Sequence, residues 1–140
     1  MNIASLAVSS PAASVRDYVS LLKPRVMTLV VFTGIAGMAA APGHIHPLLA
    51  VLAIIFLSVG AGAAGAYNMW YDRDIDAIME RTQKRPVPSG KIAPQDAHDF
   101  ALVLMFLSTI LMGVTINWVA ASLLAFAQWF YAVFYTRYLK

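Results

Sequence analysis

The chain has 140 residues, of which 60% are hydrophobic and 12% are charged, with a net charge of +3 and no cysteine. Soluble domains carry about 45–50% apolar and about 25% charged residues, so this composition excludes an ordinary soluble domain and a disordered or collagen-like chain. The lack of cysteine excludes thiol catalysis and thiolate metal sites.

The N-terminal segment differs from the rest of the chain. Residues 1–22 are rich in Ala and Ser, have no long apolar core and contain one basic residue, Arg16. This pattern does not fit a cleaved signal peptide or a transit peptide. We expect a cytoplasmic tail over 1–22 and a membrane domain over 23–140.

Two uncharged segments predict membrane-spanning helices. Residues 26–71 contain no Asp, Glu, Lys or Arg, and Pro and Gly at 42–47 interrupt them. Residues 100–136 are also uncharged, and as one helix they would be about 55 Å long, whereas about 20 residues cross a bilayer. Each segment therefore predicts a helical hairpin, the second one turning near 115–117. The expected spans are 26–41, 48–70, 98–114 and 118–136, which gives an all-α, polytopic transmembrane helix bundle.

The basic residues give this bundle an orientation. All ten Lys and Arg residues lie before the first span, between the second and third, or after the fourth, and the two opposite turns carry none. Because basic loops stay in the cytoplasm, we expect a bacterial inner-membrane protein whose N-terminus and 71–97 loop are cytoplasmic. The positive charge then indicates the lipid bilayer as partner and no nucleic acid.

Two motif matches do not fit their surroundings. Gly60–Gly65 matches the dinucleotide pattern G-x-G-x-x-G but lies within an apolar helix, where small residues favour close helix contact. Asp72–Asp76 resembles the start of a calcium-binding loop, but Ala77 and Gln83 stand where that loop needs Gly and Glu.

Three polar residues at the cytoplasmic end of the second span form a candidate metal site. Asn68, Asp72 and Asp76 are spaced four residues apart, so on a helix they fall within about 80° of one another, whereas Asp74 points elsewhere. Oxygen ligands of this kind suit Mg²⁺, which also keeps waters and substrate phosphates. The alternative is a solvated acidic helix end whose carboxylates pair with nearby arginines.

A cationic cluster follows the acidic residues. Arg81, Lys84 and Arg85 lie on the same predicted loop and are suited to bind an anion. Carboxylates alone would repel a diphosphate, but a metal ion between them and cations beside them would make a diphosphate site.

These residues resemble a known family. The stretch from Asn68 to Asp76, continuing to Arg85-Pro86-Val87-Pro88-Ser89-Gly90, is similar to the first aspartate-rich motif of the UbiA-type intramembrane prenyltransferases. Within them the likeness is greatest to the protoheme IX farnesyltransferase (heme O synthase) group. Leu21–Met27 and Tyr135–Lys140 resemble other parts of that group's sequence.

The resemblance implies a function. Members of this group transfer farnesyl from farnesyl diphosphate to the vinyl group of heme B and so form heme O. The resemblance places Mg²⁺ and the diphosphate at Asn68, Asp72 and Asp76 as metal-binding and catalytic residues. It makes Arg81, Lys84 and Arg85 diphosphate contacts.

The chain also departs from the family, whose members are longer and carry a second aspartate-rich motif. No acidic residue follows Asp99, so we expect the N-terminal half of such an enzyme, inactive alone, truncated or completed by a second chain. The alternatives are a UbiA-type enzyme acting on a quinone precursor or chlorin, and a non-catalytic membrane fragment.

Three histidines and one glutamine leave alternatives open. His44 and His46 are expected in a wet turn, and ligation of heme iron is the less favoured interpretation. His98 either contacts heme or pairs with Asp99. Gln128 within the last span is expected to join helices rather than to act in catalysis.

Overall fold

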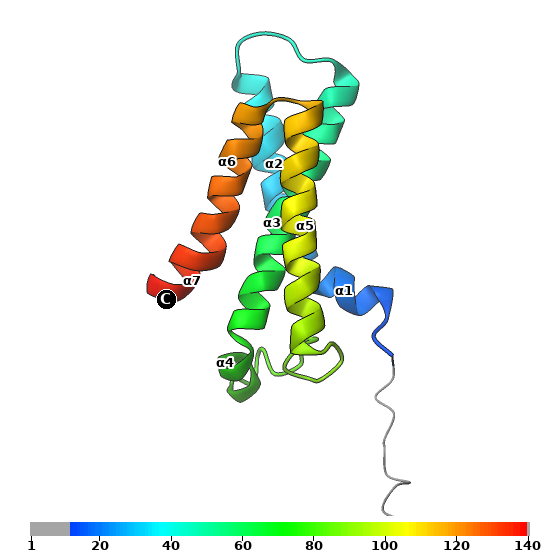
Figure 1. Cartoon of the computed structure of the whole chain (residues 1–140), viewed down its shortest axis with the longest axis vertical. Coiled ribbons are helices and arrows are strands. Elements are labelled where there is room, and N and C mark those ends of the chain that lie inside the picture. The colour runs from blue at the N-terminus through cyan, green and yellow to red at the C-terminus, as the bar shows by residue number, and fades with distance from the viewer. Residues whose placement is uncertain (1–11, 140) are drawn as a thin grey trace, which may run out of the picture.

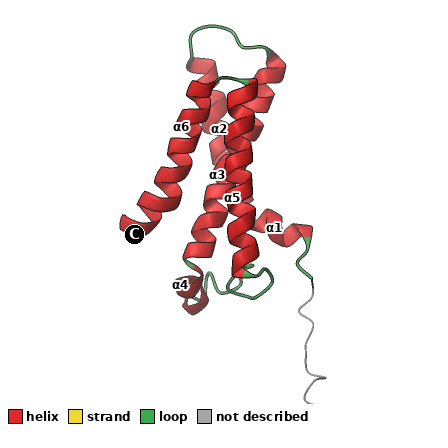
Figure 2. Ribbon diagram, viewed as in Figure 1, coloured by secondary structure: helices red, strands yellow, loops and turns green. Residues whose placement is uncertain are grey.

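The computed structural model describes residues 12–139, which form helices joined by short turns and one longer loop (Figures 1 and 2). Residue 140 and residues 1–11, which are part of the predicted tail, lie outside the described residues. The elements are α1 (Val15–Leu21), α2 (Pro24–Ala40), α3 (Pro47–Tyr71), α4 (Arg73–Ile78), α5 (Pro94–Thr115), α6 (Trp118–Trp129), the π-helix η2 (Phe130–Tyr135) and α7 (Thr136–Tyr138).

The helices are apolar enough to confirm the all-α membrane fold. In the described part of the chain, α3, α5 and the continuous helix Trp118–Tyr138 are each long and apolar enough to cross a membrane. Helices α1 and α2 meet at a 55° bend and together make a fourth candidate span. Large apolar side chains such as Phe32, Phe106 and Phe126 are exposed on the outside, as lipid contact requires. The protein is an integral membrane protein.

Helix α3 is the centre of the bundle, with α5, α2, α6 and α1 packed around it. Its small residues allow this close packing: a Cβ atom on Gly60 would overlap Nε2 of Gln128, and one on Gly62 would lie 3.1 Å from Cβ of Leu22. The Gly60–Gly65 segment thus makes close contacts with other helices, as its apolar setting indicates.

Hydrogen bonds between side chains join α5 to α6. Thr109 Oγ1 donates to Gln128 Oε1 at 3.1 Å, and Gln128 Nε2 donates to Ser108 Oγ at 3.0 Å. Gln128 is buried. Its side chain therefore links the two helices, in agreement with the interpretation from the sequence.

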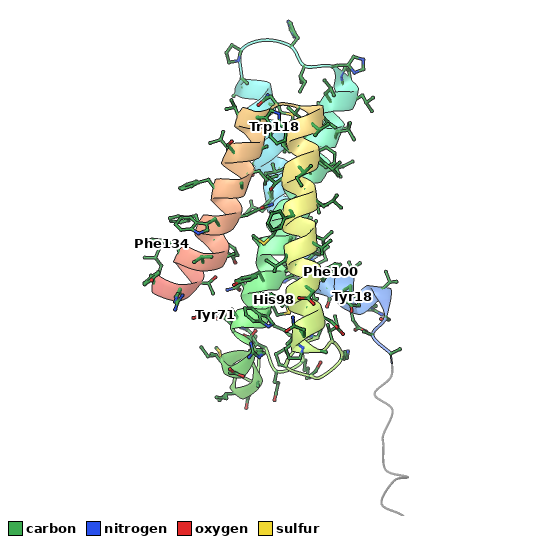
Figure 3. All side chains as sticks on the ribbon, viewed as in Figure 1. Tyr18, Tyr71, His98, Phe100, Trp118 and Phe134 are labelled. Atoms are coloured by element: carbon green, nitrogen blue, oxygen red, sulfur yellow. The ribbon has the colours of Figure 1, made fainter. Side chains whose placement is uncertain are left out.

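The N-terminal segment is partly helical rather than only a tail. Ser14 caps α1 through hydrogen bonds with Asp17. Leu21 is fully buried, and the Tyr18 ring lies 5.0 Å from that of Phe100 (Figure 3). Helix α1 is thus packed against the bundle because apolar side chains at one end of it reach α3 and α5.

The loop after α4 folds back onto the bundle. The backbone N–H of Ile92 donates to the carbonyl of Pro86 at 3.0 Å, which closes the loop on itself. Val87 and Ile92 are buried in a cluster with Leu21 and Met69. This packing fixes the segment that carries Arg85 beside the end of α3. The expected 71–97 loop therefore contains α4, and α5 begins within it at Pro94.

Candidate active site

The three predicted metal ligands lie where α3 gives way to α4. Helix α3 ends at Tyr71, and Asp72 (φ −86°, ψ 5°) separates it from α4, so the helix on which the spacing placed the three residues is interrupted at Asp72. The backbone N–H of Asp72 still donates to the carbonyl of Asn68 at 3.0 Å, and that of Asp76 donates to the carbonyl of Asp72 at 2.8 Å. These bonds keep the three side chains near one another despite the break.

All three side chains are buried, although they are polar. Asn68, Asp72 and Asp76 are 4%, 6% and 5% exposed, whereas the side chain of Asp74 is 87% exposed. Buried carboxylates are costly unless they are paired or bind metal. The burial therefore argues against a solvated helix end, although pairing of a carboxylate with an arginine, which belongs to the same alternative, is present between Asp76 and Arg85.

Asn68 makes hydrogen bonds in three directions. Its Nδ2 donates to Asp72 Oδ2 at 3.0 Å and to Thr136 Oγ1 at 3.1 Å. Its Oδ1 accepts from Lys23 Nζ at 3.1 Å. The amide thus connects the N-terminal end of α2, the end of α3 and the last helix.

Of the three predicted diphosphate contacts, the structure brings one to the carboxylates. Arg85 Nη1 lies 2.7 Å from Asp76 Oδ2, an ion pair between a partly exposed guanidinium and a buried carboxylate. Thr82 Oγ1 donates to the backbone carbonyl of Asp76 at 2.9 Å and holds the loop there. Arg81 and Lys84 are exposed, and they remain predicted anion contacts.

Lys23 and Thr136 were not predicted from the sequence as residues of the site. Lys23 has a left-handed backbone (φ 53°), unusual for a residue with a side chain, at the bend between α1 and α2. Both residues lie in stretches whose resemblance to the prenyltransferase group was an available signal, Leu21–Met27 for Lys23 and Tyr135–Lys140 for Thr136. Their contacts with Asn68 could not be predicted, because these contacts depend on how the helices pack.

An apolar cavity of about 300 Å³ lies between α2, α3 and α6, with Lys23 in its wall. Most of its lining is aliphatic, and Gln128 and Tyr131 supply polar groups. A charged group at Lys23 therefore adjoins space suited to a hydrocarbon chain. The site as a whole can hold a molecule with an anionic head and an apolar tail.

The donor set fits Mg²⁺. Two carboxylates and one amide supply hard oxygen ligands at a buried position, and Mg²⁺ is commonly held by one or two carboxylates together with substrate phosphates. Within residues 12–139 there is no group of three or more His, Asp or Glu side chains that could hold a metal ion. Asn68, Asp72 and Asp76 therefore remain predicted ligands of Mg²⁺.

Comparison of the sequence with known protein families identifies the family of this chain. A model of the UbiA prenyltransferase family matches residues 29–140. The chain belongs to the UbiA prenyltransferase family.

Curated relatives of this UbiA-family chain share one name. The protoheme IX farnesyltransferases of Rhizobium leguminosarum bv. trifolii and Rhizobium etli are 61% and 60% identical to it over 128 residues, 91% of this chain and 40% of theirs. That of Brucella ovis is 59% identical, over 91% of this chain and 41% of its own. The chain thus spans about two fifths of the length of these relatives. No solved structure matches it.

The histidines of this UbiA-family chain make contacts with other residues than the buried carboxylates. His46 Nδ1 accepts from the backbone N–H of Leu48 at 3.2 Å and caps α3 in the exposed turn, next to His44. His98 Nδ1 lies 3.0 Å from Asp99 Oδ1, and its ring is 4.5 Å from that of Trp70. The pairing of His98 with Asp99 is therefore present, and its ring packs on α3.

Proposed function

We propose that this chain supplies the diphosphate-binding part of an enzyme that transfers farnesyl from farnesyl diphosphate to the vinyl group of heme B, forming heme O. The observation that carries the proposal is the cluster of Asn68, Asp72 and Asp76 beside Lys23 and Arg85, next to an apolar cavity. The name of the relatives supports farnesyl and heme as the groups that react. On this proposal the reaction takes place in the bacterial inner membrane, with the site on the cytoplasmic side.

The residues of this chain have distinct roles in the proposed reaction. Asp72, Asp76 and Asn68 would hold Mg²⁺, which when bound stabilises the charge that develops on the diphosphate. Lys23 and Arg85 supply positive charge beside the same group, with Arg81 and Lys84 as further anion contacts on the loop. Such preplaced charges lower the barrier to departure of an anion.

The chemistry then follows from charge and burial. The bond between farnesyl C1 and the diphosphate oxygen breaks, and both electrons leave with the diphosphate. A vinyl carbon of heme B attacks the allylic cation, and water adds to the neighbouring carbon with loss of a proton. An apolar cavity keeps bulk water from capturing the allylic cation first.

A chimera tests this proposal because the relatives are longer than this chain. Residues 12–140 would replace the matching stretch of the Rhizobium leguminosarum relative, and membranes would be supplied with farnesyl diphosphate, heme B and Mg²⁺. We expect heme O, identified by mass. Asp72→Asn should lower its rate by about 100-fold or more, and the exposed control Asp74→Asn should leave it unchanged.

Two results would contradict the proposal. Full activity of Asp72→Asn would remove the metal site from the reaction. Prenylation of 4-hydroxybenzoate in place of heme would favour the quinone-directed alternative. Assay of the unfused chain, alone and with the remaining part of the relative as a second chain, would show whether the chain needs completion.

A further inference from the structure

The last helix contains a π-helical segment next to the candidate active site. Residues Phe130–Tyr135 form η2, and the hydroxyl of Thr136 donates to the carbonyl of Tyr131, five residues earlier, at 2.8 Å. A threonine on a regular helix bonds a carbonyl three or four residues earlier. π-Helical turns are rare and occur frequently at functional sites. In this π-helical turn the hydroxyl of Thr136 donates to the carbonyl five residues earlier, instead of to one three or four residues earlier.

The bond to Tyr131 limits what Thr136 can do for Asn68. A hydroxyl has one hydrogen, and the hydrogen of Thr136 is used by the Tyr131 carbonyl. Toward Asn68 the hydroxyl oxygen can therefore only accept. Asn68 must present its NH₂ group and not its oxygen, and Nδ2 lies 3.1 Å from Thr136 Oγ1.

The remaining contacts of Asn68 agree with this orientation. Its second N–H hydrogen is used by Asp72 Oδ2 at 3.0 Å, so both hydrogens of the amide are engaged. Its Oδ1 is turned toward Lys23, which lines the apolar cavity. In an amide, the oxygen is the atom that binds a cation. It has two lone pairs, and the hydrogen bond from Lys23 uses one of them.

We infer that Thr136 is a positioning residue that, through the π-helical turn, fixes the Asn68 amide with its oxygen toward the cation and diphosphate site. The effect on metal binding rests on the proposed function, whereas the effect on the amide does not. Thr136 is buried, and it acts through Asn68.

A matched set of variants separates positioning from simple helix packing. Thr136→Val keeps the shape but removes the hydroxyl, and Thr136→Ser keeps the hydroxyl. Thr109→Val removes the hydroxyl that donates to Gln128 between α5 and α6, away from Asn68. Each variant is purified in detergent as the full chain, and thermal unfolding shows that it is folded.

The first measurement is hydrogen exchange of the Asn68 side-chain amide. The sequence contains only Asn2, Asn68 and Asn117, so ¹⁵N-asparagine labelling gives three side-chain signals, and Asn68→Asp identifies the one from Asn68. We expect exchange in Thr136→Val to be at least about 10-fold faster, as expected for loss of a hydrogen bond worth about 1.4 kcal/mol. Thr136→Ser and Thr109→Val should retain slow exchange. Unchanged exchange in a folded Thr136→Val protein would overturn the inference.

The second measurement is Mn²⁺ binding, followed by electron paramagnetic resonance with inorganic pyrophosphate present. Loss of a group that orients a metal ligand weakens binding by about 10- to 100-fold, and we expect this in Thr136→Val but not in the other two variants. Equal affinity in Thr136→Val and wild type would overturn the link to metal binding. If the wild type binds no Mn²⁺ while exchange still rises in Thr136→Val, metal binding by this chain alone fails and the positioning of Asn68 stands.

Discussion

Arg85 and Lys84 are adjacent in the sequence but have different environments. The guanidinium of Arg85 pairs with Asp76 at 2.7 Å, whereas Lys84 is exposed. Asp76 has a side chain only 7% exposed, so its carboxylate depends on a nearby partner. A buried charge that loses its partner destabilises a protein more than the intact pair stabilises it. Both residues carry the same charge, and only the packing of the loop distinguishes them.

We therefore predict that Arg85→Gln destabilises the protein by about 1–3 kcal/mol. The value is below that for a fully buried pair because the Arg85 side chain is 32% exposed. Lys84→Gln removes the same charge next to it and should change stability by less than about 0.5 kcal/mol. Unfolding by dodecyl sulfate, followed by circular dichroism, measures both. Equal effects in the two variants would contradict a specific role for the ion pair.

At the scale of elements, the pattern of apolar residues predicted most of the helices. When Trp118–Tyr138 is counted as one helix, the expected spans and the helices of the structure differ by at most four residues at their ends. The break at Asp72 and the π-helical turn after Trp129 could not be predicted, because apolar periodicity does not record a local change of helix type. Helix α1 was also missed, because its seven residues are too few to form a stable helix before they pack.

Replacement of a glycine by alanine is predicted to change the stability of the protein in opposite directions on α2 and on α3. Gly60→Ala places a methyl group against Gln128 Nε2 and 3.0 Å from Leu124 Cδ1. Gln128 can move away only by losing its bonds to Ser108 and Thr109, so we expect a loss of about 1–3 kcal/mol. Gly37 on α2 has nothing within 4 Å of an added Cβ, so Gly37→Ala should stabilise the helix by up to about 1 kcal/mol.

The same dodecyl sulfate unfolding compares these two variants with the wild type. Because both substitutions are glycine to alanine within a helix, their intrinsic helix propensities change equally. If the two substitutions change stability with opposite signs, the difference therefore reports the contact at Gly60. A stabilised Gly60→Ala protein would show that α3 and α6 are not packed as closely as the structure has them.

At the scale of the whole molecule, charge separates the two ends of the bundle. Helices α1 and α4 and the start of α2 lie toward one end, and the turns at 41–46 and 116–117 lie at the other (Figure 1). The basic residues of the described chain belong to the first end, together with the buried carboxylates. The candidate active site and the positive charge are thus on the same side of the membrane.

The lack of cysteine makes this orientation directly testable. Ser89→Cys lies in the loop after α4, and His44→Cys lies in the opposite turn; both side chains are exposed. With a maleimide that does not cross membranes, Ser89→Cys should be labelled in inverted inner-membrane vesicles and His44→Cys in right-side-out vesicles. Labelling of both from one side would contradict the crossing of the membrane by α3, which lies between the two positions, and the reverse pattern would contradict the orientation.

The sequence by itself determined the class of protein, the number of apolar segments and the residues of the acidic motif. Hydropathy and charge are local properties and can be read without knowing how helices pack. Only the tertiary structure decided that Arg85 rather than Lys84 meets Asp76, and that Lys23 and Thr136 reach Asn68. Asn68 lies 45 residues from Lys23 and 68 from Thr136 along the chain, so these contacts follow from helix packing, which no single segment of the sequence specifies.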